Sequence, residues 1–102
     1  MNDPRNGPAA SQPALSIVVP AYDEVDAIGP VLAELHAVMT SAGIPFEIVV
    51  IDDGSQDNTA AAAHHAVDQP SQRSPIVVLQ HNANRGYGAA IKTGIRHARY
   101  DV

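Results

Sequence analysis

The run Phe46-Glu47-Ile48-Val49-Val50-Ile51-Asp52-Asp53-Gly54-Ser55 carries the clearest structural pattern in this 102-residue chain. Its central residues are continuously apolar and mostly β-branched, which is typical of a strand buried on both faces. Strands of this kind occur in parallel sheets that carry helices on each side. The two aspartates and the glycine that follow predict a turn at the carboxyl end of the strand.

The segments on either side repeat the order of a strand followed by a helix. Apolar runs predict the other strands, and apolar residues at helical spacing predict the first helix, which stops at Gly43 and Pro45. The expected elements are a strand over 15–19, a helix from 28 to Gly43, a strand over 46–51, a helix from 60 to about 67, a strand over 76–79, a helix from about 86 to 99, and the first step of a fourth strand at 100–102. Residues 68–75 are expected to form a surface loop, and residues 1–13 a disordered leader without the features of a signal peptide.

Repeated units of this kind predict an α/β fold with right-handed crossovers and a doubly wound parallel sheet. Ligands bind such sheets at the carboxyl ends of the strands. Polar residues gather at those ends, namely Tyr22, Asp23 and Glu24 after the first strand, Asp52 and Asp53 after the second, and 82–85 after the third. The three loops are therefore expected to converge on one crevice.

Composition excludes several classes of protein. Hydrophobic residues make up 45% of the chain and charged residues 17%, so the chain is not a disordered tail. A formal net charge of −5 disfavours general binding to nucleic acid or anionic lipid. The chain has no cysteine, which excludes disulfides, thiolate metal sites and thiol catalysis. No apolar run approaches the length of about 20 residues that a membrane-spanning helix needs.

The paired carboxylates of Asp52 and Asp53 repel each other, so they need a hydrogen-bond donor or a cation nearby. One could accept hydrogen bonds from a ribose or a base while the other faces a metal or a loop amide. Alternatively, the pair forms an Asp-Gly turn with capping roles. Because successive side chains point in different directions, we expect only one aspartate to touch a ligand directly.

The first loop does not have the glycine-rich turn of a dinucleotide site, since no glycine lies between Leu15 and Ile28. Tyr22 and Glu24 suit a nucleoside base and its polar edge better than a pyrophosphate. The alternative is a tyrosine that only packs and a glutamate that sits favourably near a helix N-terminus.

The glycines of Gly86-Tyr87-Gly88 open the third helix and allow two readings. They could permit close backbone packing, or their amides could face an anionic ligand together with Arg85 or Lys92. The histidines form no convincing metal-ligand pair and are expected to be solvated or to cap helices, namely His36, His64, His65, His81 and His97.

Three ordered motifs resemble those of family 2 glycosyltransferases. The first is the run from Ser16 to Glu24, in which Asp23 replaces the usual asparagine. The second runs from Glu47 to Thr59 and contains Asp52-Asp53-Gly54-Ser55. The third runs from Asn84 to Gly94. Within the family, the chain is most similar to the dolichol- and undecaprenyl-phosphate sugar transferases.

The resemblance implies a Rossmann-like sheet that forms the N-terminal half of a GT-A fold, and a donor such as a GDP- or UDP-sugar. It implies that Asp52 hydrogen-bonds the base or ribose and that Asp53 supports its loop. The other donor-binding residues that it implies are Pro20, Ala21, Tyr22 and Glu24 at the base and ribose, and Arg85, Gly86 and Lys92 near the donor. A lipid-phosphate acceptor would place the enzyme in the cytoplasm, peripherally at the membrane face.

The Asp-x-Asp metal motif of the family follows the fourth strand, beyond residue 102. Residues 14–102 are therefore interpreted as a donor-binding half, inactive alone, with no catalytic or metal-binding residue of its own. The full-length enzyme would need Mg²⁺ or Mn²⁺ and the missing C-terminal half. A non-catalytic nucleotide-binding or regulatory module is the alternative. A receiver-type domain and a dinucleotide oxidoreductase fit the motif order poorly.

Overall fold

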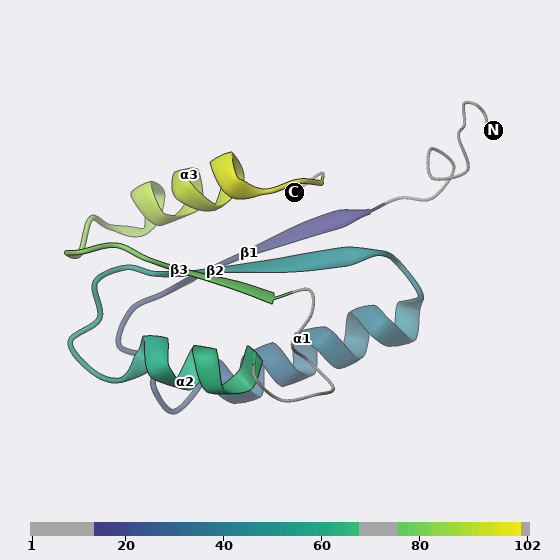
Figure 1. The fold of residues 1–102 in the computed structure, drawn as a ribbon, viewed down its shortest axis with the longest axis horizontal. Coiled ribbons are helices and arrows are strands. Elements are labelled where there is room, and N and C mark those ends of the chain that lie inside the picture. Colours follow the sequence, from purple (N-terminus) through teal and green to yellow (C-terminus); the bar gives the residue numbers. More distant parts are fainter. Residues whose placement is uncertain (1–13, 68–75, 101–102) are drawn as a thin grey trace.

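A computed structural model describes residues 14–67 and 76–100, which form one parallel sheet with helices on both faces (Figure 1). The elements are β1 (Leu15–Ala21), α1 (Ile28–Ala42), β2 (Phe46–Asp52), α2 (Thr59–Val67), β3 (Ile76–Gln80) and α3 (Tyr87–His97). The α/β order expected from the sequence is confirmed, with strand ends that extend one or two residues further. The expected leader, the loop over 68–75 and most of the expected fourth strand lie outside the described residues.

The sheet has the order β1-β2-β3, and both strand pairs are parallel. The central strand β2 is buried from Glu47 to Asp52. The continuous apolar pattern predicts this burial for residues 48–51, but not for the two acidic residues that flank them. At the carboxyl edge the register pairs Ala21 with Asp52, and Asp52 with Gln80. The last residues of all three strands therefore lie side by side at one edge of the sheet.

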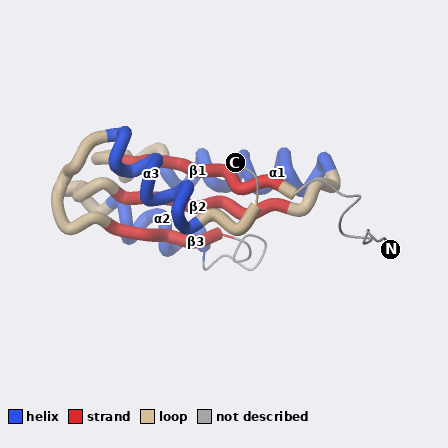
Figure 2. Tube along the Cα trace, turned by 90° about the horizontal axis from the view of Figure 1, so that it is seen from above, coloured by secondary structure: helices blue, strands red, loops and turns tan. Residues whose placement is uncertain are grey.

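The helices divide between the two faces, with α1 and α2 on one side and α3 on the other (Figures 1 and 2). Side chains of β2 alternate between these layers. Ile48 and Val50 pack with the cluster under α1 and α2, whereas Val49 and Ile51 pack under α3. Full burial of such a side chain stabilises a fold by roughly 1.5–3 kcal/mol, so β2 anchors both layers.

Helix α1 ends where the sequence predicts it. Gly43 adopts a left-handed conformation with φ 72°, and its amide hydrogen-bonds to the carbonyls of Met39 and Thr40. Glycine adopts this conformation at little cost, so it closes the last turn and turns the chain into β2.

Close packing of α3 on the sheet occurs at Gly94 and not at Gly86 or Gly88. A Cβ added to Gly94 would lie 2.4 Å from Cγ1 of Val18, whereas added Cβ atoms at Gly86 and Gly88 meet nothing within 4 Å. The close-packing interpretation of the Gly86-Tyr87-Gly88 run is therefore wrong. Gly86 instead supplies a left-handed backbone, with φ 94°, at the entry to the helix.

Candidate functional site

The candidate site lies at the carboxyl edge of the sheet, where three loops follow the three strands. The β1–α1 loop spans 22–27, the β2–α2 loop spans 53–58 and the β3–α3 loop spans 81–86. Figure 2 shows these loops at the same end of the molecule. Their convergence, expected from the parallel topology, is confirmed.

Hydrogen bonds join the first two loops. The amide of Asp23 donates to Oγ of Ser55 at 2.8 Å, and the amide of Gln56 donates to Oδ1 of Asp23 at 2.9 Å. The amide of Glu24 donates to Oγ1 of the buried Thr59 at 2.8 Å. These contacts fix the backbone of the first loop against the start of α2.

The conformation of Asp23 is compatible with the replacement of the asparagine that stands here in the motif it resembles. Its φ is 52°, a left-handed value that asparagine and aspartate tolerate better than other residues with a Cβ. Its side-chain oxygen also accepts the hydrogen bond from Gln56. Either aspartate or asparagine can serve both needs, so the replacement is compatible with the loop.

Asp52 is only 2% exposed and braces the turn that follows β2. Its Oδ1 accepts hydrogen bonds from the amide of Ser55 at 3.1 Å and from the hydroxyl of the same residue. Its Oδ2 faces Nε2 of Gln80 at 3.5 Å, the long limit for a hydrogen bond. Oδ2 is thus the less fully satisfied oxygen, and direct contact between Asp52 and a ligand remains a prediction.

Asp53 supports the third loop, as its expected role requires. Its Oδ1 accepts from the amide of Arg85 at 3.0 Å, and its Oδ2 accepts from the amide of Gly86 at 2.8 Å. His81 approaches the same carboxylate, with Nδ1 2.7 Å from Oδ1. The residue is 2% exposed, so this carboxylate faces the protein and not the solvent.

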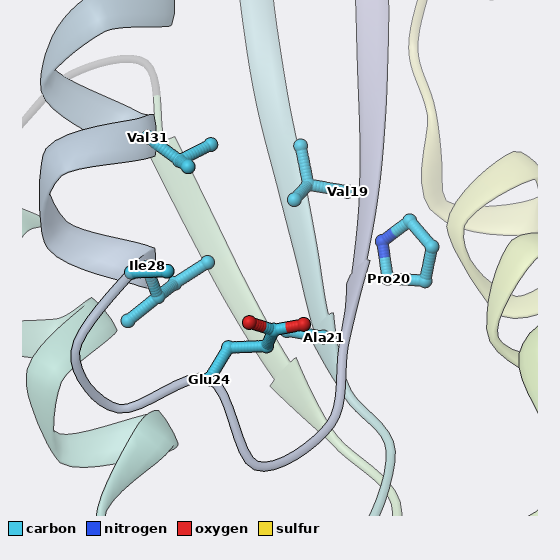
Figure 3. A pocket seen from close by; sticks show the side chains of 7 residues that line it. Val19, Pro20, Ala21, Glu24, Ile28 and Val31 are labelled. Atoms are coloured by element: carbon cyan, nitrogen blue, oxygen red, sulfur yellow. The ribbon is translucent and has the colours of Figure 1, made fainter.

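A cavity of about 160 Å³ lies between the end of β1 and the start of α1 (Figure 3). The carboxylate of Glu24 points into the space between Val19 and Ile28, while the ring of Pro20 lies on the other side of the strand. The side chain of Tyr22 is partly exposed at the same edge. The cavity is lined by Val19, Pro20, Ala21, Glu24, Ala27, Ile28 and Val31.

The two cations expected near a donor are solvent-exposed. Arg85 lies in the third loop and Lys92 lies on α3. Within residues 14–67 and 76–100, neither charged head forms a hydrogen bond or an ion pair. Both charged heads are therefore available to an anion.

His81 corrects the expectation that the histidines are solvated or cap helices. Its side chain is 7% exposed, and its Nε2 lies 2.8 Å from Oγ1 of Thr93 on α3. His36 also has a packing contact, edge-to-face with Phe46 at a centroid distance of 5.6 Å. The position of His81, directly after β3 and level with Asp53, is the sequence feature that could have indicated its role.

Sequence reasoning also missed a buried network at the opposite edge of the sheet. Glu47 is 1% exposed, and its Oε2 accepts from the hydroxyl of Ser16 and from the amide of Arg99, both at 2.6 Å. The amide of Tyr100 in turn donates to Oγ of Ser16 at 3.0 Å. This network holds the segment after α3 beside the beginning of β1.

The pKa values of three carboxyl groups are lowered in the fold, which predicts that the fold loses stability in acid. The hydrogen bond from His81, followed by the amides of Arg85 and Gly86, lowers the pKa of Asp53 below its ordinary 3.8. Burial raises the pKa of Glu47, but the Arg99 amide and the Ser16 hydroxyl outweigh it and bring it below 4.5.

Asp57 behaves in the same way, because hydrogen bonds from the hydroxyl and amide of Thr59 lower its pKa below 3.8. A lowered folded-state pKa gives stability that is complete above the unfolded pKa and is lost as the pH falls through the folded one. We therefore expect the urea midpoint to be level from pH 7 to about pH 5 and to fall steeply below about pH 4. Asp53→Asn should flatten this fall, and equal midpoints at pH 3 and pH 7 would contradict the assignment.

Across residues 14–67 and 76–100, no three histidine, aspartate or glutamate side chains gather closely enough to hold a metal ion. Oδ1 of Asp52 and both oxygens of Asp53 already accept hydrogen bonds from loop donors. The described residues therefore do not fit a divalent-cation site. Within the same part of the chain, no helix is long and apolar enough to cross a bilayer.

Several proteins of known class resemble the chain. An undecaprenyl-phosphate 4-deoxy-4-formamido-L-arabinose transferase of Edwardsiella ictaluri is 36% identical over 88 residues, covering 86% of this chain and 26% of the relative. The transferase of the same name from Shewanella sediminis matches equally well, at 36% identity and the same coverage. The chain thus spans about a quarter of the length of these curated relatives.

A solved structure, the mannosyltransferase PcManGT from Pyrobaculum calidifontis in complex with GDP-Man and Mn²⁺, superposes with a TM-score of 0.66. It is 26% identical, and the match covers 85% of this chain and 25% of that one. The GT-A type of fold expected from the motifs is thereby confirmed. The model of glycosyl transferase family 2 matches residues 16–102. The chain belongs to glycosyl transferase family 2.

Proposed function

We propose that this chain provides the nucleotide-binding part of a glycosyltransferase that moves a hexose from a GDP- or UDP-sugar to a polyprenyl phosphate. The names of the relatives, which are undecaprenyl-phosphate sugar transferases, support the class of acceptor. The solved neighbour, which was crystallised with GDP-Man, supports the class of donor. A peripheral position at the cytoplasmic face of a membrane follows from a lipid acceptor and is part of the proposal.

The observation that carries the proposal is the cavity beside β1, together with the hydrogen-bonded loops at its rim. Glu24 directs a carboxylate into an otherwise apolar space. Tyr22 lies two residues before it in the same loop, with a partly exposed ring. An aromatic ring can stack on a base, while a carboxylate accepts hydrogen bonds from base or ribose donors. The backbone at Pro20 and the small side chain of Ala21 complete the wall and leave room for the nucleoside.

Two further groups of residues have distinct roles in the proposed site. Asp52 contributes through Oδ2, the oxygen held only by the long contact to Gln80. Arg85 and Lys92 face the diphosphate in this proposal. The uncapped amides at the start of α3, such as that of Tyr87, face it as well. Asp53 and Gly86 hold the loop that carries Arg85.

The proposed enzyme also uses a divalent cation, as the Mn²⁺ in the neighbour's complex suggests. When bound, such an ion neutralises charge on the departing nucleoside diphosphate. The described residues do not supply its ligands, so their proposed task is limited to binding and orienting the nucleotide.

Amide chemical shifts measured during titration with GDP and UDP test the proposed site. We expect the largest changes over 21–24, 52–56 and 81–88, where the three loops meet. The amides of Gly43, Ile44 and Phe46, at the opposite edge of the sheet, should not shift. The largest changes at that opposite edge, or the absence of binding by either nucleotide, would contradict the proposal for this chain.

Two substitutions localise the binding further. Tyr22→Ala and Glu24→Gln should each weaken nucleotide binding about tenfold, which is the loss expected for one good contact. Glu34→Gln is the matched control, because Glu34 is exposed on α1 and does not line the cavity. Isothermal titration should find an unchanged dissociation constant for the control; equal constants for Glu24→Gln and Glu34→Gln would remove Glu24 from the site.

A further inference from the structure

His81 is a buried titratable residue to which the proposed chemistry gives no task. Its imidazole lies between two elements, with Nδ1 2.7 Å from Oδ1 of Asp53 and Nε2 2.8 Å from Oγ1 of Thr93. Its side chain is 7% exposed and that of Asp53 is 2% exposed. Its own amide donates to the carbonyl of Asp52 at 2.9 Å. The residue is therefore held by backbone and side chain at the junction of β2, β3 and α3.

The partners of the ring determine its tautomer. The Asp53 carboxylate carries a lowered pKa and only accepts hydrogen bonds, so Nδ1 must carry a proton. In the neutral ring Nε2 then accepts, and the hydroxyl of Thr93 donates to it. This arrangement leaves the lone pairs of the Thr93 hydroxyl directed away from the ring, where Nη2 of Arg96 lies at 3.5 Å. Each hydrogen-bond donor from Asp53 through His81 to Thr93 therefore faces an acceptor.

The consequence concerns the orientation of the Asp53 carboxylate. Oδ1 is shared between His81 and the amide of Arg85, and Oδ2 accepts from the amide of Gly86. A carboxylate without the imidazole could rotate and would lose its alignment with the two loop amides. Thr93 is the neighbour of Lys92 on α3, so the same imidazole also fixes the helix that carries this cation.

We propose that His81 is a positioning residue for the donor site, which holds Asp53 and α3 in register and so keeps the 81–86 loop at the rim. This inference rests on the proposed function where it concerns the nucleotide. The hydrogen-bonded line from Asp53 through His81 to Thr93 does not depend on that function and can be tested separately.

Hydrogen exchange measured by NMR on the whole chain tests the positioning directly. In His81→Leu, the amides of Arg85 and Gly86 should exchange at least about tenfold faster relative to those of Val49 and Val50 than in the wild type. His81→Asn, whose side-chain amide can still donate to Asp53, should recover part of this protection. His97→Asn on the exposed face of α3 is the matched control. It should leave the exchange of the Arg85 and Gly86 amides, relative to the strand amides, unchanged.

Two outcomes would overturn the proposal. One is an equal acceleration at all four amides, which would mean that His81 contributes only to global stability. The other is a ring whose ¹⁵N shifts show the proton on Nε2 instead of Nδ1. For the nucleotide, His81→Leu should weaken GDP or UDP binding about tenfold, with partial recovery in His81→Asn. If the wild-type chain binds neither nucleotide, the proposed function fails, while the exchange ratio and the tautomer still decide the positioning role.

Discussion

Replacement of Glu47 by alanine is expected to lower the free energy of unfolding by about 3 kcal/mol, measured by urea denaturation at pH 7. The carboxylate is 1% exposed and accepts from the Ser16 hydroxyl and the Arg99 amide, both at 2.6 Å. Its removal leaves two donors at a buried site without an acceptor, and each such donor costs about 1–3 kcal/mol. The lost side-chain volume beside β1 adds to this cost.

Two control variants separate the buried hydrogen bonds from charge. Glu34→Ala removes an exposed carboxylate from α1 and should change stability by no more than about 0.5 kcal/mol. Arg99→Ala keeps the backbone amide that donates to Glu47 and removes only a guanidinium contact at 3.4 Å from a side chain that is 66% exposed. It should cost less than about 1 kcal/mol. If Arg99→Ala proves as damaging as Glu47→Ala, the ion pair and not the buried hydrogen bonds would be the source of stability.

The main features of the fold are predictable from sequence because they depend on local patterns. A continuous apolar run can be stable only when both faces are covered, and β2 is covered by α1 and α2 on one face and α3 on the other. Gly43 ends α1 because a left-handed residue is needed there. The convergence of the three loops at one edge then follows from parallel pairing alone.

The features that sequence did not predict depend on partners far apart in the chain. Glu47 in a strand gives no local sign that Ser16 and Arg99 will surround it, since they lie 31 and 52 residues away. His81 likewise meets Asp53 at a separation of 28 residues. The polarity of a buried side chain can be read from sequence, but the identity of its partner depends on the packed structure.

The glycines show the same limit in a different way. Close packing is one of the two readings that Gly86 and Gly88 allow, and the structure places the close packing at Gly94 instead. Which face of α3 meets the sheet depends on the rotation of the helix about its axis, and the short repeat of glycines does not determine that rotation. In the site itself, loop support by Asp53 could be anticipated from the motif, whereas the burial of Asp52 could not.

The substitution Gly54→Ala, at the carboxyl edge of the sheet, is expected to lower the free energy of unfolding by about 3 kcal/mol. Gly54 has φ +74°, and an added Cβ would lie 2.4 Å from the backbone carbonyl carbon of Ala83 and from the amide nitrogen of Asn84. The left-handed backbone accounts for about 1–2 kcal/mol of this loss. The rest comes from displacing the β3–α3 loop, because backbone atoms cannot rotate away as the end of a side chain can.

Gly43→Ala isolates the contact from the backbone strain. Gly43 has nearly the same φ, +72°, but a Cβ there meets nothing within 4 Å. It should therefore cost only the strain, about 1–2 kcal/mol, and leave the loops unchanged. Amide shifts over 81–86 should move in Gly54→Ala and stay in place in Gly43→Ala, and GDP or UDP binding should weaken only in the former. Equal losses of stability in the two variants, with no shift of the 81–86 amides, would mean that Gly54 is needed for its turn and does not set the position of the third loop.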